Sequence, residues 1–249
     1  MTWLMRAEVL KITSTRLALG ILGGSAAYVV VNVVALVFTA GQPGVPSLAL
    51  ASTVRGVYAS AGAASPIVLV AGVLGMTTEY RFMTVTPTFL VTPRRGRVLA
   101  AKLTVHAAFG VVIGLVCALV SATVATVLLG LRPHAAVHPV TVAQIGAATL
   151  LGYALFAVVG VSVGALVRNQ IAAIIGALLW TLVIEGLLVA FLPSVGRWLP
   201  GGALRAVLQT QTFNGGKLLP AWGATFVLLG YTAAFAAVAA RTTLRRDVT

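Results

Sequence analysis

The sequence predicts an all-α, polytopic membrane protein in which about six helices cross the bilayer. Three observations carry this prediction. Of the 249 residues, 59% are hydrophobic and only 8% are charged. A soluble domain carries about 25% charged residues, whereas a surface that faces lipid needs almost none. The few charges also occur in clusters, which leaves uncharged stretches long enough for helices of about 20 apolar residues.

Six of these stretches are expected to be membrane spans, with ends set to within about four residues. The whole chain, residues 1–249, then forms a single transmembrane domain. Three segments outside the spans are informative: an N-terminal segment (1–16), the loop after the second span (77–102) and the segment before the last span (193–220). The predicted spans are 17–38, 60–76, 105–129, 145–167, 171–192 and 222–240.

The 17 lysines and arginines are divided unequally between the two sides of the membrane. Six spans put both termini on one side, and cytoplasmic loops carry the excess of basic residues. Cytoplasmic termini place 12 basic residues inside. This clustering at span ends explains the formal net charge of +13 and leaves no basic face for a nucleic acid. The five outside are Arg55, Arg132, Arg197, Arg205 and Lys217.

Residues 1–16 mix apolar and charged side chains at helical spacing. The pattern predicts an amphipathic helix that lies in the membrane interface before the first span. A frayed basic anchor is the alternative. The apolar members are Trp3, Leu4, Val9, Leu10 and Ile12, and the charged members are Arg6, Glu8, Lys11 and Arg16.

The predicted cytoplasmic loop 77–102 reads TTEYRFMTVTPTFLVTPRRGRVLAAK and is the most distinctive stretch of the chain. It opens with Glu79 and Arg81, continues through an apolar and threonine-rich middle, and ends in a Pro-Arg turn and Lys102. A solvated loop has no reason to expose a cluster of apolar side chains. That cluster consists of Phe82, Met83, Phe89, Leu90 and Val91.

The loop resembles that of the small ABC-2-type permeases of bacterial ABC exporters. Their loop between spans two and three has an acidic-aromatic-basic start, a short helix with threonine, a Pro-x-Arg turn and a lysine that opens span three. This chain departs from the pattern at Phe82-Met83, where a polar residue and a glycine are common, and at Pro87. The matching residues are Glu79, Tyr80, Arg81, Thr84, Leu90, Pro93, Arg95 and Lys102.

The resemblance implies a coupling helix in this loop that docks into a groove of a separate cytosolic ABC ATPase. A short helix with apolar side chains and basic flanks suits a lever that carries force into the membrane. The alternative is an ordinary basic loop that follows the positive-inside rule. The residues expected to couple to the ATPase are Glu79, Tyr80, Arg81, Phe82, Thr84, Phe89, Leu90, Pro93 and Arg95.

The predicted external segment 193–220 is too apolar for a free loop. It resembles the short external or re-entrant helices that the same family places before its last span. Trp198 and Trp222 fit the aromatic belt at the membrane interface. The apolar residues of the segment include Trp198, Leu199, Leu204, Val207, Leu208 and Leu218.

Glu185 is the one charged residue near the middle of a predicted span. A carboxylate at this depth is costly and usually faces a bundle interior or a water-filled cavity. No Lys or Arg lies at a comparable depth in another predicted span, so we expect no ion-pair partner within one protomer. Two interpretations stay open: a residue of the substrate cavity or protomer interface, or a structural glutamate hydrogen-bonded to a neighbouring helix.

Several motifs point away from catalysis by this chain. No G-x-x-x-x-G-K-[ST] motif occurs, so ATP and Mg²⁺ are expected on the partner ATPase, with no cofactor or metal on this chain. Gly160-Val161-Ser162-Val163-Gly164 matches the G-x-S-x-G pattern of hydrolases, but that site needs a strand-turn-helix elbow and this copy falls within a span. It is better interpreted as a helix-packing face of small residues, as are Gly20/Gly24 and Gly110/Gly114.

His134 and His138 are four residues apart but lie between prolines and near no acidic residue, which disfavours a metal site. Cys117 is the single cysteine, which excludes an intramolecular disulfide.

The residues and the resemblance together predict a permease subunit that forms a homodimer or pairs with a paralogue in the bacterial plasma membrane. ATP hydrolysis by a separate ATPase would drive export of an amphipathic substrate such as a drug, an antibiotic or a lipid. The chain itself is then not an enzyme. One alternative is a membrane-embedded protease, for which four acidic residues offer few catalytic groups. The other is a non-transporting membrane subunit that senses or anchors a partner.

Overall fold

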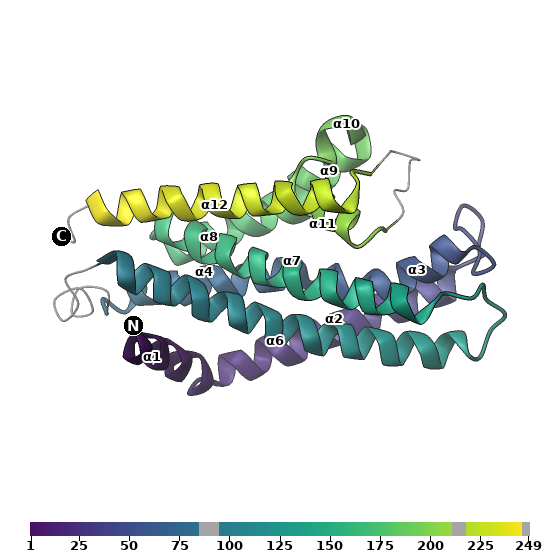
Figure 1. Ribbon diagram of the computed structural model, residues 1–249, viewed down its shortest axis with the longest axis horizontal. Helices are drawn as coiled ribbons and strands as arrows, with labels where there is room; N and C mark the ends of the chain where they lie inside the picture. The colour runs from purple at the N-terminus through teal and green to yellow at the C-terminus, as the bar shows by residue number, and fades with distance from the viewer. Residues whose placement is uncertain (85–94, 211–217, 246–249) are drawn as a thin grey trace.

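The computed structural model describes residues 1–84, 95–210 and 218–245, and within these ranges every regular element is helical. Six helices or helix runs are long and apolar enough to cross a membrane. They lie side by side along the long axis of the molecule, and both chain termini lie at the same end (Figure 1). The predicted fold, an all-α bundle with six candidate spans, is therefore confirmed.

The elements follow one another up and down the bundle (Figure 1). Two spans are assembled from several shorter helices, and the other four are single helices. The described elements are α1 (Thr2–Thr13), α2 (Arg16–Thr39), α3 (Ala51–Ala59), the 3₁₀ helix η1 (Ser60–Ala64), α4 (Ser65–Arg81), α6 (Arg95–Leu129), α7 (Pro139–Leu166), α8 (Gln170–Leu178), the π-helix η2 (Leu179–Ile184), α9 (Glu185–Phe191), α10 (Pro193–Gly196), α11 (Pro200–Val207) and α12 (Ala221–Arg245).

Three spans begin earlier than their hydropathy predicts. The second, third and fourth begin at residues 51, 96 and 139, instead of the predicted 60, 105 and 145. These earlier helix starts do not contradict the predicted spans, because uncharged runs mark only the hydrocarbon core, whereas a helix continues into the headgroup region as long as its backbone stays bonded. The same extension carries α4 to Arg81, so the predicted loop 77–102 begins as helix.

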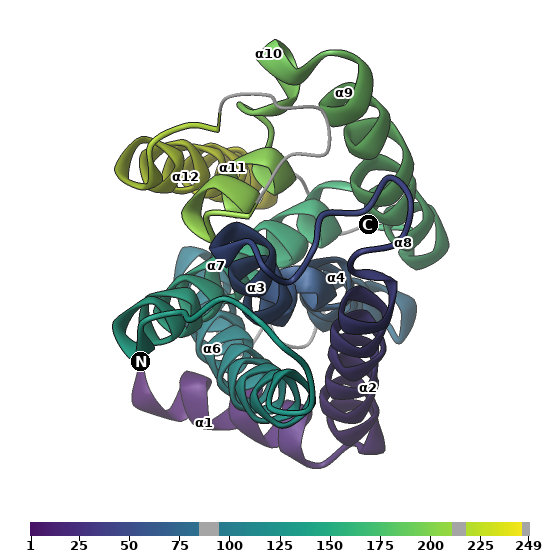
Figure 2. The same ribbon diagram turned by 90° about the vertical axis from the view of Figure 1, so that its right-hand side faces the viewer.

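α7 lies at the centre of the bundle, with α4 and α6 beside it and α2, α8 and α12 further out (Figure 2). Glycines let the central helices approach closely. A Cβ on Gly72 would clash with the carbonyl oxygen of Ala157, and one on Gly160 would lie 3.0 Å from the Cα of Gly72. A Cβ on Gly110 would lie 2.5 Å from the carbonyl oxygen of Tyr153. Small residues therefore let the backbones of these helices approach closely, which is how helices pack in a membrane, where burial of large apolar side chains gives no driving force.

The glycine pairs predicted from sequence divide into two kinds. Gly160/Gly164 and Gly110/Gly114 do lie in helix contacts. Gly20 and Gly24 of α2 are exposed, and a Cβ on either would meet no atom of the described residues within 4 Å. The α2 pair therefore packs against nothing within the described part of this chain.

The second span changes helix type midway, at η1. Pro66 lies in the first turn of α4 and has no backbone N–H to continue the preceding helix. The fully buried Tyr153 of α7 compensates the interrupted backbone. Its Oη donates to the carbonyl oxygen of Ala61 at 2.6 Å and accepts from the N–H of Ala64 at 3.0 Å. A break in a span is tolerated when a neighbouring helix satisfies the freed backbone groups in this way.

Candidate functional site

Four charged side chains meet where α1 packs against α6, at the end of the bundle that carries both termini (Figure 1). Lys102 Nζ lies 2.6 Å from Glu8 Oε2 and 3.0 Å from Glu79 Oε1. Lys11 Nζ lies 2.7 Å from Glu8 Oε1 and 2.5 Å from Glu79 Oε1. We call Glu8, Lys11, Glu79 and Lys102 the ion-pair cluster; it joins α1, α4 and α6.

Most of the ion-pair cluster is removed from solvent. The side chain of Lys102 is 1% exposed and those of Glu8 and Glu79 are 6% and 7% exposed, whereas that of Lys11 is 47% exposed. Lys102 Nζ also donates to the carbonyl oxygen of Gly75 at 3.0 Å. Two lysines face two glutamates, so the formal charge of the cluster is zero. Charges this deeply buried persist only when each is paired and hydrogen-bonded.

The spacing of residues along each helix builds the cluster. Leu4, Glu8 and Lys11 recur at intervals of four and three, which places them on one face of α1. Leu4 packs against Val98 and Ala101 of α6 and so brings the charged part of this face to Lys102. The predicted N-terminal helix therefore forms, but its buried face carries charges, while Trp3 and Leu10 lie exposed on the other side.

Lysine neighbours stabilise the ionised form of Glu8. Burial opposes its ionisation, but the charges and hydrogen bonds of Lys102 and Lys11 outweigh burial and lower the pKa of Glu8 below its usual 4.5. Burial likewise opposes the charge on Lys11, yet hydrogen bonds to Glu79 and Glu8 raise its pKa above 10.5. Both groups are therefore charged near neutral pH.

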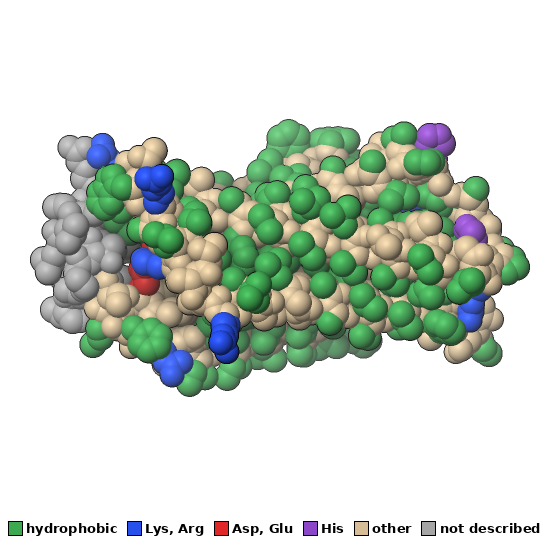
Figure 3. All heavy atoms as spheres, turned by 90° about the horizontal axis from the view of Figure 1, so that it is seen from below, with side chains coloured by type: hydrophobic (Ala, Val, Ile, Leu, Met, Phe, Trp, Pro, Cys, Tyr) green, Lys and Arg blue, Asp and Glu red, His purple; other side chains and the backbone are tan. Residues whose placement is uncertain are grey.

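A groove of about 460 Å³ lies beside the cluster, between α1 and α2 on one side and α4 and α6 on the other. Glu8, Lys11, Glu79 and His106 line its polar end. Figure 3 shows an acidic side chain beside a basic one in a hollow near this end of the molecule. The apolar part of the groove is lined by Leu17, Ala18, Ile21, Leu74 and Phe109.

The predicted coupling residues begin on the last turn of α4, not in a loop. Glu79 faces the ion-pair cluster, Tyr80 lies under the guanidinium of Arg168 at 5.8 Å from its ring centroid, and Arg81 donates to Gln170 at 3.3 Å. Phe82 follows the helix and is 64% exposed. Arg95 is the first residue of α6. The coupling helix expected in this loop, with Phe89, Leu90 and Pro93, lies outside the described residues.

α4 ends in the two hydrogen bonds of a Schellman motif. The N–H of Met83 donates to the carbonyl oxygen of Tyr80 at 3.3 Å, and that of Thr84 donates to the carbonyl oxygen of Glu79 at 3.0 Å. Met83 has φ 57°, the left-handed conformation that this motif usually gives to glycine.

Glu185 lies at the start of α9 and is 3% exposed. Its Oε1 accepts hydrogen bonds from the backbone N–H groups of Gly201 and, at 3.2 Å, Gly202. These are unsatisfied donors of the first turn of α11, where a helix carries partial positive charge. A Cβ on Gly201 would lie 2.9 Å from Oε1, so a larger residue there would displace the carboxylate. Within the described part of the chain Glu185 thus forms hydrogen bonds to a helix N-terminus in the segment 193–220 and no ion pair, as expected for the hydrogen-bonded interpretation.

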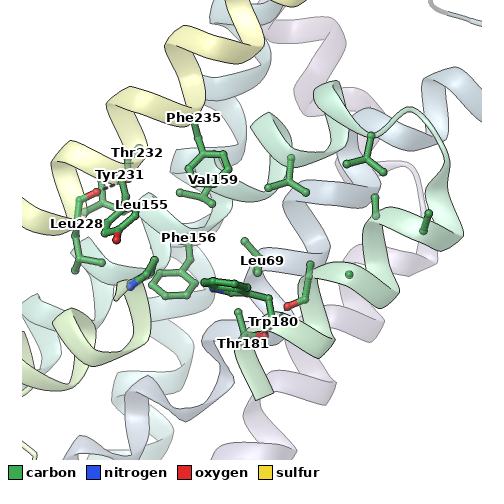
Figure 4. Close-up of a pocket in the computed structure, with 17 residues that line it drawn as sticks. Leu69, Leu155, Phe156, Val159, Trp180, Thr181, Leu228, Tyr231, Thr232 and Phe235 are labelled. Atoms are coloured by element: carbon green, nitrogen blue, oxygen red, sulfur yellow. Dashed lines mark hydrogen bonds between the residues drawn. The ribbon is translucent and has the colours of Figure 1, made fainter. Parts of the chain in front are cut away.

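A second cavity, of about 220 Å³, lies between α7, the α8–η2 run and α12. Phe156, Trp180, Tyr231 and Phe235 surround it, as Figure 4 shows. The π-helix η2 contributes Trp180 and Thr181, and π segments are frequent at functional sites. This cavity has no charged lining residue among those described, and Glu185 lines neither cavity.

Comparisons with known proteins supply no family for the chain. No family model matches it, and no curated protein matches it. What the chain does must therefore be inferred from its own residues.

Sequence reasoning placed Glu8 and Lys11 in the N-terminal segment and Glu79 and Lys102 in the loop 77–102, and it missed that the two pairs meet. Nothing in the sequence pattern indicated that His106 would be buried, at 3% exposure, beside this cluster. One signal was present: the chain has only four acidic residues, and three of them, Glu8, Glu79 and Glu185, are buried. Acidic residues this rare in an apolar chain are each expected to have a specific partner.

Proposed function

We propose that the chain is the permease subunit of a bacterial ABC exporter. In this proposal it lies in the plasma membrane with both termini in the cytoplasm, and a separate ABC ATPase drives it. The observation that carries the proposal is the ion-pair cluster, because it binds α1, α4 and α6 together at the end that bears the resembling loop. The exposed Phe82 and Met83 lie directly beside it.

A cytosolic ATPase can move membrane helices only through a contact that stays rigid under load. Glu79 and Lys102 lie at the two ends of the loop between α4 and α6, and a 3.0 Å ion pair joins them. Force applied to this loop would therefore reach both spans and, through Glu8, also α1. The left-handed conformation of Met83 at the Schellman end of α4 is one that glycine adopts readily, and glycine is common at this position of the resembling loop.

Dimerisation and the choice of substrate extend the same proposal. The spans formed by α2, by α8 to α9 and by α12 bury little of their surface within the described part of the chain. In the proposal these faces pack against lipid and against a second copy or a paralogue. The substrate is amphipathic and crosses at the contact between the two permeases, while ATP and Mg²⁺ bind only to the ATPase. The chain itself carries out no catalysis.

Co-purification with a cytosolic ATPase tests the proposal. A protein with an exposed apolar docking surface should lose its partner when a charge enters that surface, because an uncompensated buried carboxylate is costly. We expect Phe82→Asp to remain in the membrane but to abolish ATPase association and transport. Leu131→Asp is the matched control, since Leu131 is 77% exposed and lies in the loop at the opposite end of the bundle. Unchanged ATPase association in Phe82→Asp would contradict docking at this loop.

Cysteine labelling in intact cells tests the orientation. In a Cys117→Ser background, a cysteine at the exposed Thr13 should resist a thiol reagent that cannot cross the membrane, and one at the exposed His134 should react. The opposite pattern would place both termini outside, where no cytosolic ATPase could reach Phe82.

A further inference from the structure

Two acceptor atoms of largely buried residues that line the groove accept no hydrogen bond within the described ranges. Glu79 uses Oε1 for both of its lysine contacts, and its Oε2 accepts no hydrogen bond from that part of the chain. His106 Nδ1 lies 2.9 Å from the carbonyl oxygen of Lys102, which can only accept, so Nδ1 carries the hydrogen. In the neutral ring Nε2 is then a bare acceptor, and it too has no partner within the described ranges. Glu79 is 5% exposed and His106 is 3% exposed.

The two acceptors occupy neighbouring positions at the polar end of the groove. His106 lies against α4 at Gly75, where a Cβ would overlap the imidazole ring. Gly75 and Glu79 are four residues apart, so they share one face of α4 with a separation of about 6 Å along the helix axis. Both Glu79 and His106 line the groove. A ligand that donates hydrogen bonds would find both acceptors at the wall of the groove, and each such bond would favour its binding.

Charge balance narrows the ligand further. The ion-pair cluster already sums to zero, so a monocation or a monoanion would leave a net charge in a largely buried site. A zwitterion would not. Lys11 Nζ has three N–H groups, of which two are used by Glu8 and Glu79, and the side chain is half exposed at the edge of the groove. An anionic group can therefore be held at Lys11 while a cationic group reaches Glu79 Oε2.

The groove also continues into the apolar part of the bundle. From Glu79 to Ala71 its lining extends along α4 for about 12 Å. Leu17, Ile21 and Phe109 line it at the level of the spans. Its volume of about 460 Å³ falls within the range of about 300–1,000 Å³ typical of small-molecule sites. The cavity between α7 and α12, at about 220 Å³, falls below that range.

We infer that this groove binds one molecule of a membrane phospholipid with an ethanolamine headgroup. The primary ammonium donates to Glu79 Oε2 and His106 Nε2, the phosphate accepts from Lys11 Nζ, and an acyl chain follows Ile21 and Phe109. A choline headgroup carries the same charges but has no N–H to donate, so it leaves both acceptors unsatisfied. An anionic glycerol headgroup would add a negative charge beside Glu8 and Glu79.

Lipid binding at this groove needs no ATPase, so the purified chain in detergent is sufficient for the test. Calorimetry should compare short-chain phosphatidylethanolamine with phosphatidylcholine and phosphatidylglycerol of the same chain length, and with glycerophosphoethanolamine, which has the headgroup alone. We expect phosphatidylethanolamine to bind at least about tenfold more tightly than phosphatidylcholine. The hydrogen bonds to Glu79 Oε2 and His106 Nε2 both need the ammonium hydrogens that choline lacks. Equal binding of the two, or tighter binding of phosphatidylglycerol, would overturn the assignment. Binding of the headgroup alone as tightly as the lipid would show that a free phosphoamine, and not a lipid, is the ligand.

Two matched substitutions locate the site. Ala18→Trp fills the groove and should reduce phosphatidylethanolamine binding at least about tenfold, while Ala172→Trp fills the cavity between α7 and α12 and should leave it unchanged. Thermal unfolding should show that both variants are folded. His106→Phe replaces the imidazole with an aromatic ring that has no nitrogen, so it removes both Nε2 and the Nδ1 hydrogen bond to Lys102 and should reduce the preference for ethanolamine over choline. Full binding in Ala18→Trp, or a preference that His106→Phe leaves intact, would contradict binding at this groove.

Discussion

Glu79, in the last turn of α4, and Glu185, at the start of α9, are both buried carboxylates, but different groups compensate their charges. Glu79 contacts the lysine side chains of α1 and α6, which lie 68 and 23 residues away in the chain. Among the described residues, Glu185 accepts hydrogen bonds from two backbone N–H groups of α11, 16 and 17 residues away. Full charges therefore hold distant helices together at one site, and a helix terminus holds a local turn at the other.

The difference bears on what each site can do. A lysine can change partners or lose its proton without refolding of the backbone, so the ion-pair cluster can respond to a ligand or a docked protein. The N–H groups at the start of α11 cannot move without unwinding that helix. This comparison favours a structural role for Glu185, one of the two interpretations that the sequence left open, and a responsive role for Glu79.

Removal of Lys102 should have the largest effect on stability. Lys102→Met leaves Glu8 and Glu79 buried with only the half-exposed Lys11 as a partner. Loss of one member of a buried ion pair costs about 3–5 kcal/mol, because the remaining charge is desolvated and uncompensated. The free energy of unfolding in detergent should fall by that amount.

The control for this prediction is Lys11→Met. Its side chain is 47% exposed, so water replaces much of the lost interaction and the cost should stay below about 1 kcal/mol. Adding Glu8→Gln and Glu79→Gln to Lys102→Met should recover stability. Equal costs for the two lysine substitutions would show that burial does not distinguish them.

Substitution of Glu185 should have an intermediate effect. Glu185→Leu leaves the N–H groups of Gly201 and Gly202 without an acceptor, at about 1–3 kcal/mol for each unsatisfied group. Glu185→Gln keeps an amide oxygen at the same place and should lose only the charge interaction with the helix terminus, about 0.3–1 kcal/mol. Thermal unfolding of both variants gives this order, with Leu the less stable.

Transport measurements on the same pair separate structure from function. If Glu185 only holds α11, Glu185→Gln should transport normally. A fully active Glu185→Leu that is also more stable than the wild type would mean that the carboxylate holds nothing. A stable but inactive Glu185→Gln would instead restore the substrate-cavity interpretation.

The membrane spans could be predicted because charge-free length is itself the physical requirement for a span. The break at η1 had a local signal, Pro66. The backbone groups that this break frees are satisfied by Tyr153, some 90 residues away, and no local pattern shows that contact. Glu185 was recognised as costly, yet its partner is a backbone terminus that leaves no mark in composition. Lys102 was noted for its place in a motif, while its burial depends on how α1 folds back onto α6.

The smallest expected effect is that of pH on the docking of α1. The pKa of Glu8 is lowered from 4.5 in the folded chain, so its contribution to docking is present above pH 4.5 and is lost as pH falls through the lower, folded pKa. The pKa of Lys11 is raised from 10.5, so its contribution is present below pH 10.5 and is lost as pH rises through the higher, folded pKa. Docking should therefore be constant between about pH 5 and 10 and weaken on either side.

A spin label on a cysteine that replaces the exposed Arg6, in a Cys117→Ser background, reports the mobility of α1. The mobile fraction should rise below about pH 4.5 in the wild type. Glu8→Gln should remove most of this acid transition, because the amide does not titrate, and should raise the mobile fraction at pH 7. Glu185→Gln, which alters the carboxylate held by a helix terminus, should leave the profile unchanged. An acid transition that survives Glu8→Gln at full amplitude would assign it to another group and weaken the contrast between the two carboxylate sites.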